Sequence, residues 1–289
     1  MPRIVEERIS PIAEALRASA DLIDLLEERD LQYVAVREIL SSIGDLKKAS
    51  FLIAGLASVS YMLTTKGEEH WLAFSSYVAE NSKLSPNRIL TGFIEEGRSL
   101  ARFRASRLKR INRWISALPE FEARFEEFRE DLDEFRRFVA RVLNASMEDK
   151  TVVFSVKMFY YALKAADLNV SIPMEIPVPV DRRVALVSLT SGLIEHPKGL
   201  TAANELRNRY PGLVRKAWGR VCRLAQVPPL RVDTLLWIVG GFLEKSKFKY
   251  SLAVKLVEEW LRVRLNAKWK DLIRELSYRV VETRDIHFL

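Results

Sequence analysis

The chain has 289 residues, enough for one large domain or two small ones, and its 48% hydrophobic content is that of a packed globular protein. A single cysteine, Cys222, and three scattered histidines, His70, His196 and His287, exclude a disulfide framework and a Cys- or His-rich metal site, and leave only a carboxylate-bound magnesium open. The net charge of +8 favours a polyanionic partner, because clustered Lys and Arg release condensed counterions from nucleic acid.

No apolar run approaches the roughly 20 residues that cross a bilayer, and the charged start MPRIVEERIS lacks the apolar centre of a signal peptide. We therefore expect an intracellular protein of the cytoplasm that has no membrane contact. The scarcity of glutamine and the 29% charged residues are typical of a thermophilic protein.

Apolar residues recur at three- and four-residue steps along most of the chain, notably in residues 12–26, 51–62, 71–78 and 125–142. Turn signals separate these stretches: Ser85-Pro86-Asn87, Leu118-Pro119, Ser171-Ile172-Pro173, His196-Pro197-Lys198-Gly199, Tyr210-Pro211-Gly212 and Val227-Pro228-Pro229. Strand-type alternation is hard to find. The sequence predicts an all-α fold of about ten to twelve helices of ordinary length.

A strongly basic run, RSLARFRASRLKRINR, occupies residues 98–113 and contains no acidic residue. Its basic members are Arg98, Arg102, Arg104, Arg107, Lys109, Arg110 and Arg113. The segment that follows, PEFEARFEEFREDLDEF, is mainly acidic. A solvated helix face would explain either run, and a surface that binds DNA phosphates is the alternative for the basic one.

The stretch DKTVVFSVKMF, residues 149–159, places two lysines in an apolar run. At about 100° per residue, one side of a helix carries Lys150, Phe154, Lys157 and Tyr161, and the other side is aliphatic. Periodicity by itself favours a solvated lysine stripe, because lysine is rarely buried without a partner. The aromatic residues in the stripe instead favour a pocket wall that stacks bases and holds phosphates.

Two proline-rich entries each precede a helical pattern. In SIPMEIPVPVDRRVALVSL, Asp181 stands where a helix N-cap belongs, so its carboxylate should accept backbone N–H groups; a cap needs no further function. In QVPPLRVDTLLWIVGG, Asp233 and Trp237 lie four residues apart on one helix face. An acceptor beside a flat ring suits a purine pocket, and a cap beside a core tryptophan explains the pair equally well.

Together these segments resemble a known family, the archaeal GO glycosylases (AGOG) of the helix-hairpin-helix DNA glycosylase superfamily. The resemblance rests on LQYVAVREIL (31–40), EEHWLAF (68–74), EDKTVVFSVKMFYYA (148–162), IPVPVDRRVA (176–185) and PPLRVDTLLWIVG (228–240). It implies one all-α glycosylase unit over residues 1–289, with two helical subdomains and the active site in the cleft between them. The hairpin and catalytic helix would occupy about residues 140–165, and the N- and C-terminal helices would pack together as one subdomain.

The resemblance also implies an activity and its residues. Family members excise 8-oxoguanine and cleave the abasic site, with Lys150 as the Schiff-base nucleophile and Asp181 as the catalytic carboxylate. The implied base-binding residues are Gln32, Trp71, Phe154, Lys157, Asp233 and Trp237. The partner would be double-stranded DNA containing 8-oxoguanine, with single-stranded DNA as a further candidate; the protein would act as a monomer at the nucleoid and without a cofactor.

Two features depart from the family pattern. The approach ASMEDKT lacks the Gly-x-Gly of the usual hairpin. The segment after about residue 243 shows no motif that we match to the family, so its role stays open and helix packing is the default for Trp260 and Trp269. The residue types nevertheless suit the chemistry: an amine can open the sugar as an iminium, and an ionised carboxylate stabilises the positive charge that develops on it. A glycosylase for another damaged purine and a non-enzymatic nucleic-acid-binding protein are the alternatives.

Overall fold

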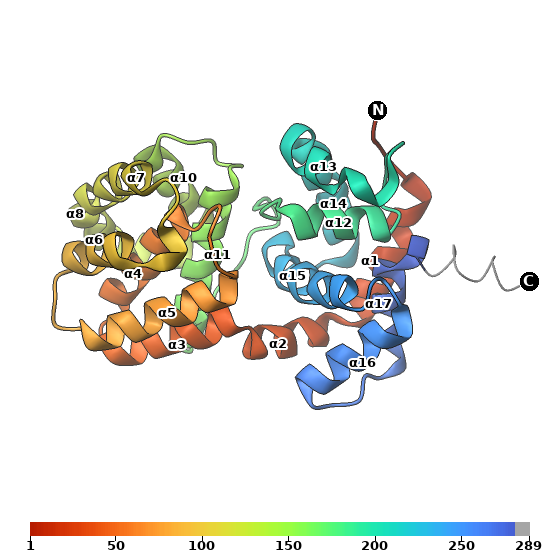
Figure 1. Ribbon diagram of the computed structural model, residues 1–289, viewed down its shortest axis with the longest axis horizontal. Helices are drawn as coiled ribbons and strands as arrows, with labels where there is room; N and C mark the ends of the chain where they lie inside the picture. The colour runs from red at the N-terminus through yellow and green to blue at the C-terminus, as the bar shows by residue number, and fades with distance from the viewer. Residues whose placement is uncertain (281–289) are drawn as a thin grey trace, which may run out of the picture. The chain divides into compact units, whose positions relative to one another are not determined.

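The computed structural model describes residues 1–280, and the chain divides into two compact helical units (Figure 1). The first unit comprises Met1–Arg29 together with the chain from Met174 onward, and the second is Asp30–Pro173. Helices dominate both units, so the all-α prediction is confirmed. None of the helices in residues 1–280 combines the length and apolar character that a membrane crossing requires.

The second unit is built around one central helix. Its elements are α3 (Leu31–Ile43), α4 (Leu46–Val59), α5 (Gly67–Glu80), α6 (Pro86–Glu96), the short 3-10 helix η2 (Arg98–Leu100), α7 (Arg104–Ser116), α8 (Leu118–Ala123), α9 (Phe125–Glu130), α10 (Leu132–Leu143) and α11 (Lys150–Ala165). Helix α11 packs on α3, α4 and α10, and is therefore enclosed along most of its length.

Aromatic rings fill the core of this unit. The rings of Phe51 and Trp114 stack with centroids 5.0 Å apart, and the Trp114 indole N–H donates to the Phe51 carbonyl at 3.0 Å. Gly55 permits this approach, because a Cβ there would lie 2.5 Å from Nε1 of Trp114. Phe159 of α11 contacts Phe135 of α10 at 4.1 Å between centroids, so the aromatic core anchors α11.

The first unit joins both ends of the described chain. Its elements are β1 (Arg3–Ile4), η1 (Glu6–Arg8), α1 (Ile9–Ala18), α2 (Ala20–Arg29), α12 (Arg182–Thr190), β2 (Ile194–Glu195), η3 (Gly199–Ala202), α13 (Ala203–Arg209), α14 (Pro211–Ala225), α15 (Pro229–Lys245), α16 (Tyr250–Leu261) and α17 (Ala267–Leu276). Helix α1 packs on α14 and α17, and α12 packs on α15. The two short strands pair antiparallel, with Arg3 opposite Glu195.

The C-terminal tryptophans pack within this unit. Trp260 of α16 lies against Phe242 at 5.9 Å between ring centroids. Trp269 of α17 is partly buried and donates its indole N–H to Asp21 at 3.0 Å. Helix packing, the expected default for both residues, is confirmed.

The number of helices was predicted too low, because α1 to α17 lie within residues 1–280. The stretch 12–26 breaks at Ser19, between α1 and α2. The stretch 125–142 breaks at Asp131, whose carboxylate accepts from the N–H groups of Asp133 at 2.7 Å and Glu134 at 3.2 Å. Apolar residues continue at helical spacing on both sides of each break, so periodicity alone could not locate it.

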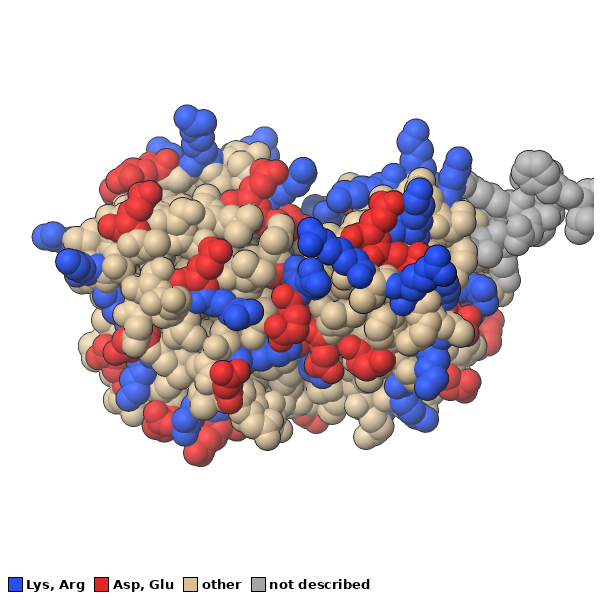
Figure 2. Space-filling model, turned by 90° about the horizontal axis from the view of Figure 1, so that it is seen from below, with Lys and Arg blue, Asp and Glu red and all other residues tan. Residues whose placement is uncertain are grey.

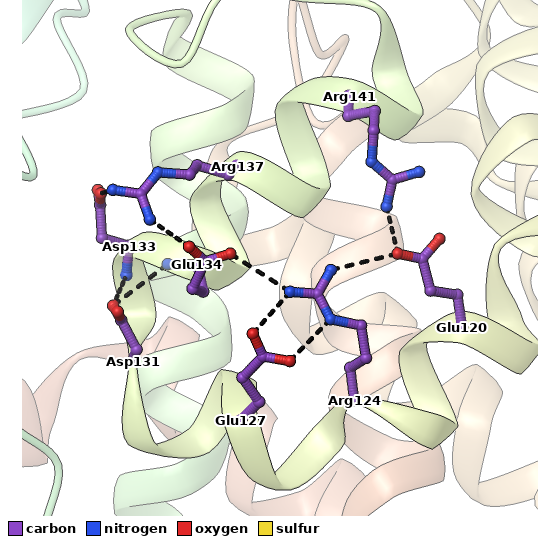
Figure 3. A network of polar contacts seen from close by, with 8 residues as sticks. All are labelled: Glu120, Arg124, Glu127, Asp131, Asp133, Glu134, Arg137 and Arg141. Atoms are coloured by element: carbon purple, nitrogen blue, oxygen red, sulfur yellow. Dashed lines mark hydrogen bonds and ion pairs between the residues drawn. The ribbon is translucent and has the colours of Figure 1, made fainter.

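The acidic segment after the basic run forms an ion-paired surface over α8 to α10 (Figure 3). Arg124 is at its centre and contacts Glu127 at 2.7 Å and both Glu120 and Glu134 at 3.3 Å. Arg141 pairs with Glu120 as well. A solvated face, the simpler interpretation of this segment, agrees with these contacts.

Candidate functional site

A tight turn between α10 and α11 presents Lys150. Asn144 ends α10 in the left-handed region, at φ 50°, and so supplies without glycine the conformation that a glycine would favour. Asp149 is the N-cap residue of α11, and its carboxylate accepts from the N–H of Ser146 at 3.3 Å. Lys150 is the first residue of the helix and is exposed. The turn therefore places an accessible amine at a helix start.

Lys157 lies two turns further along α11 and is 1% exposed. Its ammonium lies 5.4 Å from the ring centroid of Tyr161, which is also buried. The solvated-stripe interpretation is therefore wrong for these two residues, because neighbouring helices enclose α11. The alternative, a lysine beside an aromatic ring, is what the structure contains, and Phe154 between the two lysines is half-buried.

A buried polar cluster connects α11 with the start of α3. The Tyr161 hydroxyl donates to Oδ2 of Asp30 at 3.0 Å, and Oδ1 of Asp30 accepts from the backbone N–H of Gln32 at 2.9 Å. Gln32 is 5% exposed, and its side-chain Oε1 is buried without a hydrogen-bond partner among residues 1–280. Buried acceptors are almost always paired, so this amide is suited to a ligand that donates a hydrogen bond.

Trp71 adds an aromatic wall to the same unit. Its side chain is buried on α5 and meets the half-buried Phe154 edge to face, with ring centroids 6.2 Å apart and planes at 70°. Helices α3, α5 and α11 thus bring Gln32, Trp71, Phe154 and Lys157, four of the predicted base-binding residues, into one unit.

His70, which the sequence did not single out, lies behind this wall. Its imidazole is buried and bridges the C-cap of α4 and the 3-10 helix η2, with Nε2 2.9 Å from the Ser60 hydroxyl and Nδ1 2.8 Å from the Ser99 hydroxyl. Ser60 donates its own proton to the Leu56 carbonyl, so its oxygen accepts from Nε2–H and leaves Nδ1 as an acceptor. Burial, reinforced by the charge of Arg107, lowers the pKa of His70 to about 3.

The other predicted site residues belong to the first unit. Asp181 is the N-cap of α12, and its Oδ1 accepts from the N–H of Val184 at 2.9 Å, which confirms the predicted cap. The carboxylate is half-buried, and the cap uses only one of its oxygens. Asp233 is 6% exposed on α15, and Trp237 lies half-buried one turn later.

The basic run does not form one uniform surface. Arg107 is fully buried, and its guanidinium donates to the carbonyls of Val59 at 3.0 Å, Leu100 at 3.2 Å and Tyr61. The predicted phosphate contact of Arg107 is therefore corrected: this side chain ties the end of α4 to η2. The run has helical spacing, and one face of α7 must point inward.

Two further members of the run have contacts near the turn before α11. Arg110 is partly buried and donates to the Thr151 hydroxyl at 2.7 Å, and Arg113 reaches the Leu143 carbonyl at 3.5 Å. The exposed members are Arg98, Arg102, Arg104, Lys109 and Arg113. On the face seen in Figure 2, Lys and Arg are interspersed with Asp and Glu.

Within residues 1–280, no three His, Cys, Asp or Glu side chains are grouped so that they could hold an ion. His287 lies outside the described residues. Cys222 is buried in the core of the first unit, and burial raises the pKa of its thiol, so it is a poor nucleophile.

The chain is similar to a family of known proteins. A family model described as AGOG, N-glycosylase/DNA lyase, matches residues 13–273. A protein named N-glycosylase/DNA lyase from Pyrobaculum aerophilum is 33% identical over 237 residues, covering 81% of this chain and 87% of its own length. A protein of the same name from Aeropyrum pernix is 32% identical, and the match covers 82% of this chain and 84% of that protein. Another from Thermococcus kodakarensis is 30% identical, and the match covers 88% of this chain and 91% of that protein.

A solved structure is similar as well. It is the crystal structure of an 8-oxoguanine DNA glycosylase from Pyrobaculum aerophilum in complex with 8-oxoguanosine. The TM-score is 0.71 at 29% sequence identity, and the match covers 91% of this chain and 98% of that one.

Proposed function

Because the chain belongs to the AGOG family of N-glycosylase/DNA lyases, we propose that it excises 8-oxoguanine from DNA and then cleaves the abasic site. The observation that carries the choice of substrate is the buried Oε1 of Gln32, which has no hydrogen-bond partner within residues 1–280, in a unit that also holds the buried Lys157. A buried acceptor and a buried cation in one unit would suit a purine that offers both an N–H and a carbonyl oxygen. The related glycosylase in complex with 8-oxoguanosine supports the same substrate.

Lys150 is the proposed nucleophile. Its free amine attacks C1′ of the damaged nucleotide, and the bond from C1′ to the purine breaks with its electron pair leaving on the base. Once Nζ has lost a proton, C1′ carries both Nζ and the ring oxygen O4′. The C1′–O4′ bond then breaks, O4′ takes up a proton, and an iminium forms between Nζ and C1′. Loss of a proton from C2′ then expels the 3′ phosphate by β-elimination. Water as the nucleophile could not form this iminium. An exposed lysine in the first turn of α11 is accessible for this attack.

Asp181 is the proposed catalytic carboxylate. Breaking the glycosidic bond develops positive charge on the sugar, which a fixed carboxylate stabilises. The N-cap hydrogen bond to Val184 fixes the side chain through Oδ1 and leaves Oδ2 for this role. The same carboxylate can accept the proton that C2′ loses.

Base recognition follows from the remaining groups. The duplex hides both faces of a paired base, so the nucleotide must leave the stack, at a cost of a few kcal/mol. Stacking on Phe154 and Trp237 offsets this cost, with Trp71 as the wall behind Phe154. Gln32, Lys157 and Asp233 would bind the edge of the purine.

DNA phosphates would contact the exposed members of the basic run, which are Arg98, Arg102, Arg104, Lys109 and Arg113. Such contacts give affinity without sequence preference. Single-stranded DNA carries the same phosphates and is therefore a second candidate substrate. The protein would work as a monomer at the nucleoid.

Borohydride trapping on a duplex containing 8-oxoguanine tests this proposal, because it reduces the iminium to a stable covalent adduct. The wild-type protein should form the adduct, and Lys150→Gln should abolish it. Lys157→Gln is the matched control on the same helix: it should still be trapped on a pre-formed abasic site while excising the base slowly. An adduct that survives Lys150→Gln and disappears in Lys157→Gln would transfer the nucleophile to Lys157.

A panel of lesions completes the experiment. If the protein forms an adduct with a deaminated or alkylated purine but not with 8-oxoguanine, that purine is its substrate and the proposal for 8-oxoguanine is wrong. Absence of any adduct on all lesions and on abasic sites would reduce the protein to a nucleic-acid-binding role.

A further inference from the structure

The guanidinium of Arg183 lies over the indole ring of Trp237, with its central carbon 3.8 Å from the ring centroid. Nη1 of Arg183 also donates to the backbone carbonyl of Trp237 at 3.4 Å. On the same helix, Oε2 of Glu244 lies 3.6 Å from Nε of Arg183. The Arg183 side chain is 25% exposed. Three groups of α15 contact it: the Trp237 ring, the Trp237 carbonyl and the Glu244 carboxylate, and together they fix its position over the ring.

Two adjacent glycines in α15 accommodate this side chain. A Cβ on Gly241 would lie 3.4 Å from Cζ of Arg183, and a Cβ on Gly240 would lie 2.9 Å from Cγ2 of Val187. Glycine is unfavourable inside a helix, and α15 carries two of them where α12 approaches. One turn beyond Trp237, α15 therefore has no side chain that would obstruct Arg183 where it crosses the helix.

We propose that Arg183 is a positioning residue for base excision, which holds the Trp237 ring as a stacking surface for the purine. This inference rests on the proposed function. A cation over an aromatic face is attracted by the ring quadrupole, and it confines a stacked base to the opposite face. Arg183 lies two residues after Asp181, so the start of α12 fixes both the catalytic carboxylate and the stacking ring.

The role predicts a split between two activities of the same enzyme. Excision of 8-oxoguanine needs the stacking ring, whereas cleavage of a pre-formed abasic site has no base to stack. Arg183→Gln should lower the single-turnover rate of excision about tenfold, the effect of losing one partly buried cation–π contact. Cleavage of the abasic duplex should stay within about twofold of wild type. Calorimetric titration should show weaker binding of 8-oxoguanosine.

Two further variants complete the test. Arg183→Lys keeps a cation over the ring and should restore part of the excision rate. Arg182→Gln is the matched control: Arg182 pairs with the same Glu244, and both activities should stay unchanged.

Three outcomes would overturn the inference: no change in either activity, an equal loss of both, or a fall in excision that follows the thermal midpoint across all variants. If Arg183→Gln does not fold, the ratio of excision to abasic cleavage in Arg183→Lys decides, because a purely structural role leaves that ratio at the wild-type value. A wild-type protein that leaves 8-oxoguanine in the duplex contradicts the proposed function instead, and this outcome is recognisable before any variant is measured.

Discussion

At the scale of single residues, His70 makes stability depend on pH. Its pKa is about 3 in the folded protein and 6.5 when unperturbed, so below pH 6.5 the unfolded chain binds the additional proton. Stability is therefore fully present above pH 6.5, falls as the pH is lowered, and the loss is complete near pH 3. At pH 5 the loss amounts to about 2 kcal/mol relative to neutral pH.

His70→Gln should remove this dependence, because an amide keeps hydrogen-bonding capacity without titrating. Urea unfolding at pH 7.5 and pH 5 measures the free energy of unfolding of both proteins. The wild-type value minus the His70→Gln value should fall by about 2 kcal/mol between pH 7.5 and pH 5. Parallel pH profiles would show that the buried imidazole does not set the acid sensitivity.

At the scale of elements, the ion pairs around Arg124 join three short helices. Arg124 contacts Glu120, Glu127 and Glu134, which lie on α8, α9 and α10. Because these side chains are partly exposed, Arg124→Gln should lower the free energy of unfolding by at most about 1 kcal/mol at 25 °C. The relative loss should grow on heating, because the desolvation penalty of ion pairs falls with temperature.

Thermal unfolding measures the contribution of this network. We expect Arg124→Gln to lower the midpoint by about 2 °C at low salt and by less at high salt. Arg129→Gln is the control, because Arg129 has a single ion pair among the described residues 1–280, with Glu126 at 2.8 Å, and should shift the midpoint less. Equal shifts for both variants would mean that the network adds nothing beyond separate pairs.

At the scale of the whole molecule, the excess of 46 basic over 38 acidic residues predicts salt-dependent DNA binding. Replacing Arg98, Arg102 and Lys109 with Gln should weaken binding to damaged and undamaged duplexes alike. Each lost phosphate contact should lower the slope of log affinity against log salt by about 0.9. Titration of a labelled duplex at several salt concentrations measures this slope.

Lys255→Gln is the control for charge, because it removes an exposed cation from α16, outside the basic run. It should leave the slope unchanged. A similar change in slope for Lys255→Gln would assign the effect to net charge and not to the run.

The sequence alone determined the all-α class, the cap at Asp181 and the family, because helical periodicity, proline-led helix starts and ordered motifs are local signals. It missed breaks such as Asp131, where apolar spacing continues across the cap. The expected roles of Lys150 and of the base-binding residues came from the resemblance and remain proposals.

Tertiary structure alone decided the environment of each charge. From sequence spacing, Lys157 and Arg107 look like surface cations. In the fold, the helices around α11 bury Lys157, and Arg107 is buried and donates to three backbone carbonyls. Likewise, two features could not be predicted from the sequence: the burial of the Gln32 Oε1 without a partner among residues 1–280, and the guanidinium over Trp237. Each depends on helices that meet only after folding. Local spacing specifies which face of a helix a residue occupies, and only the packing of other helices specifies what that face meets.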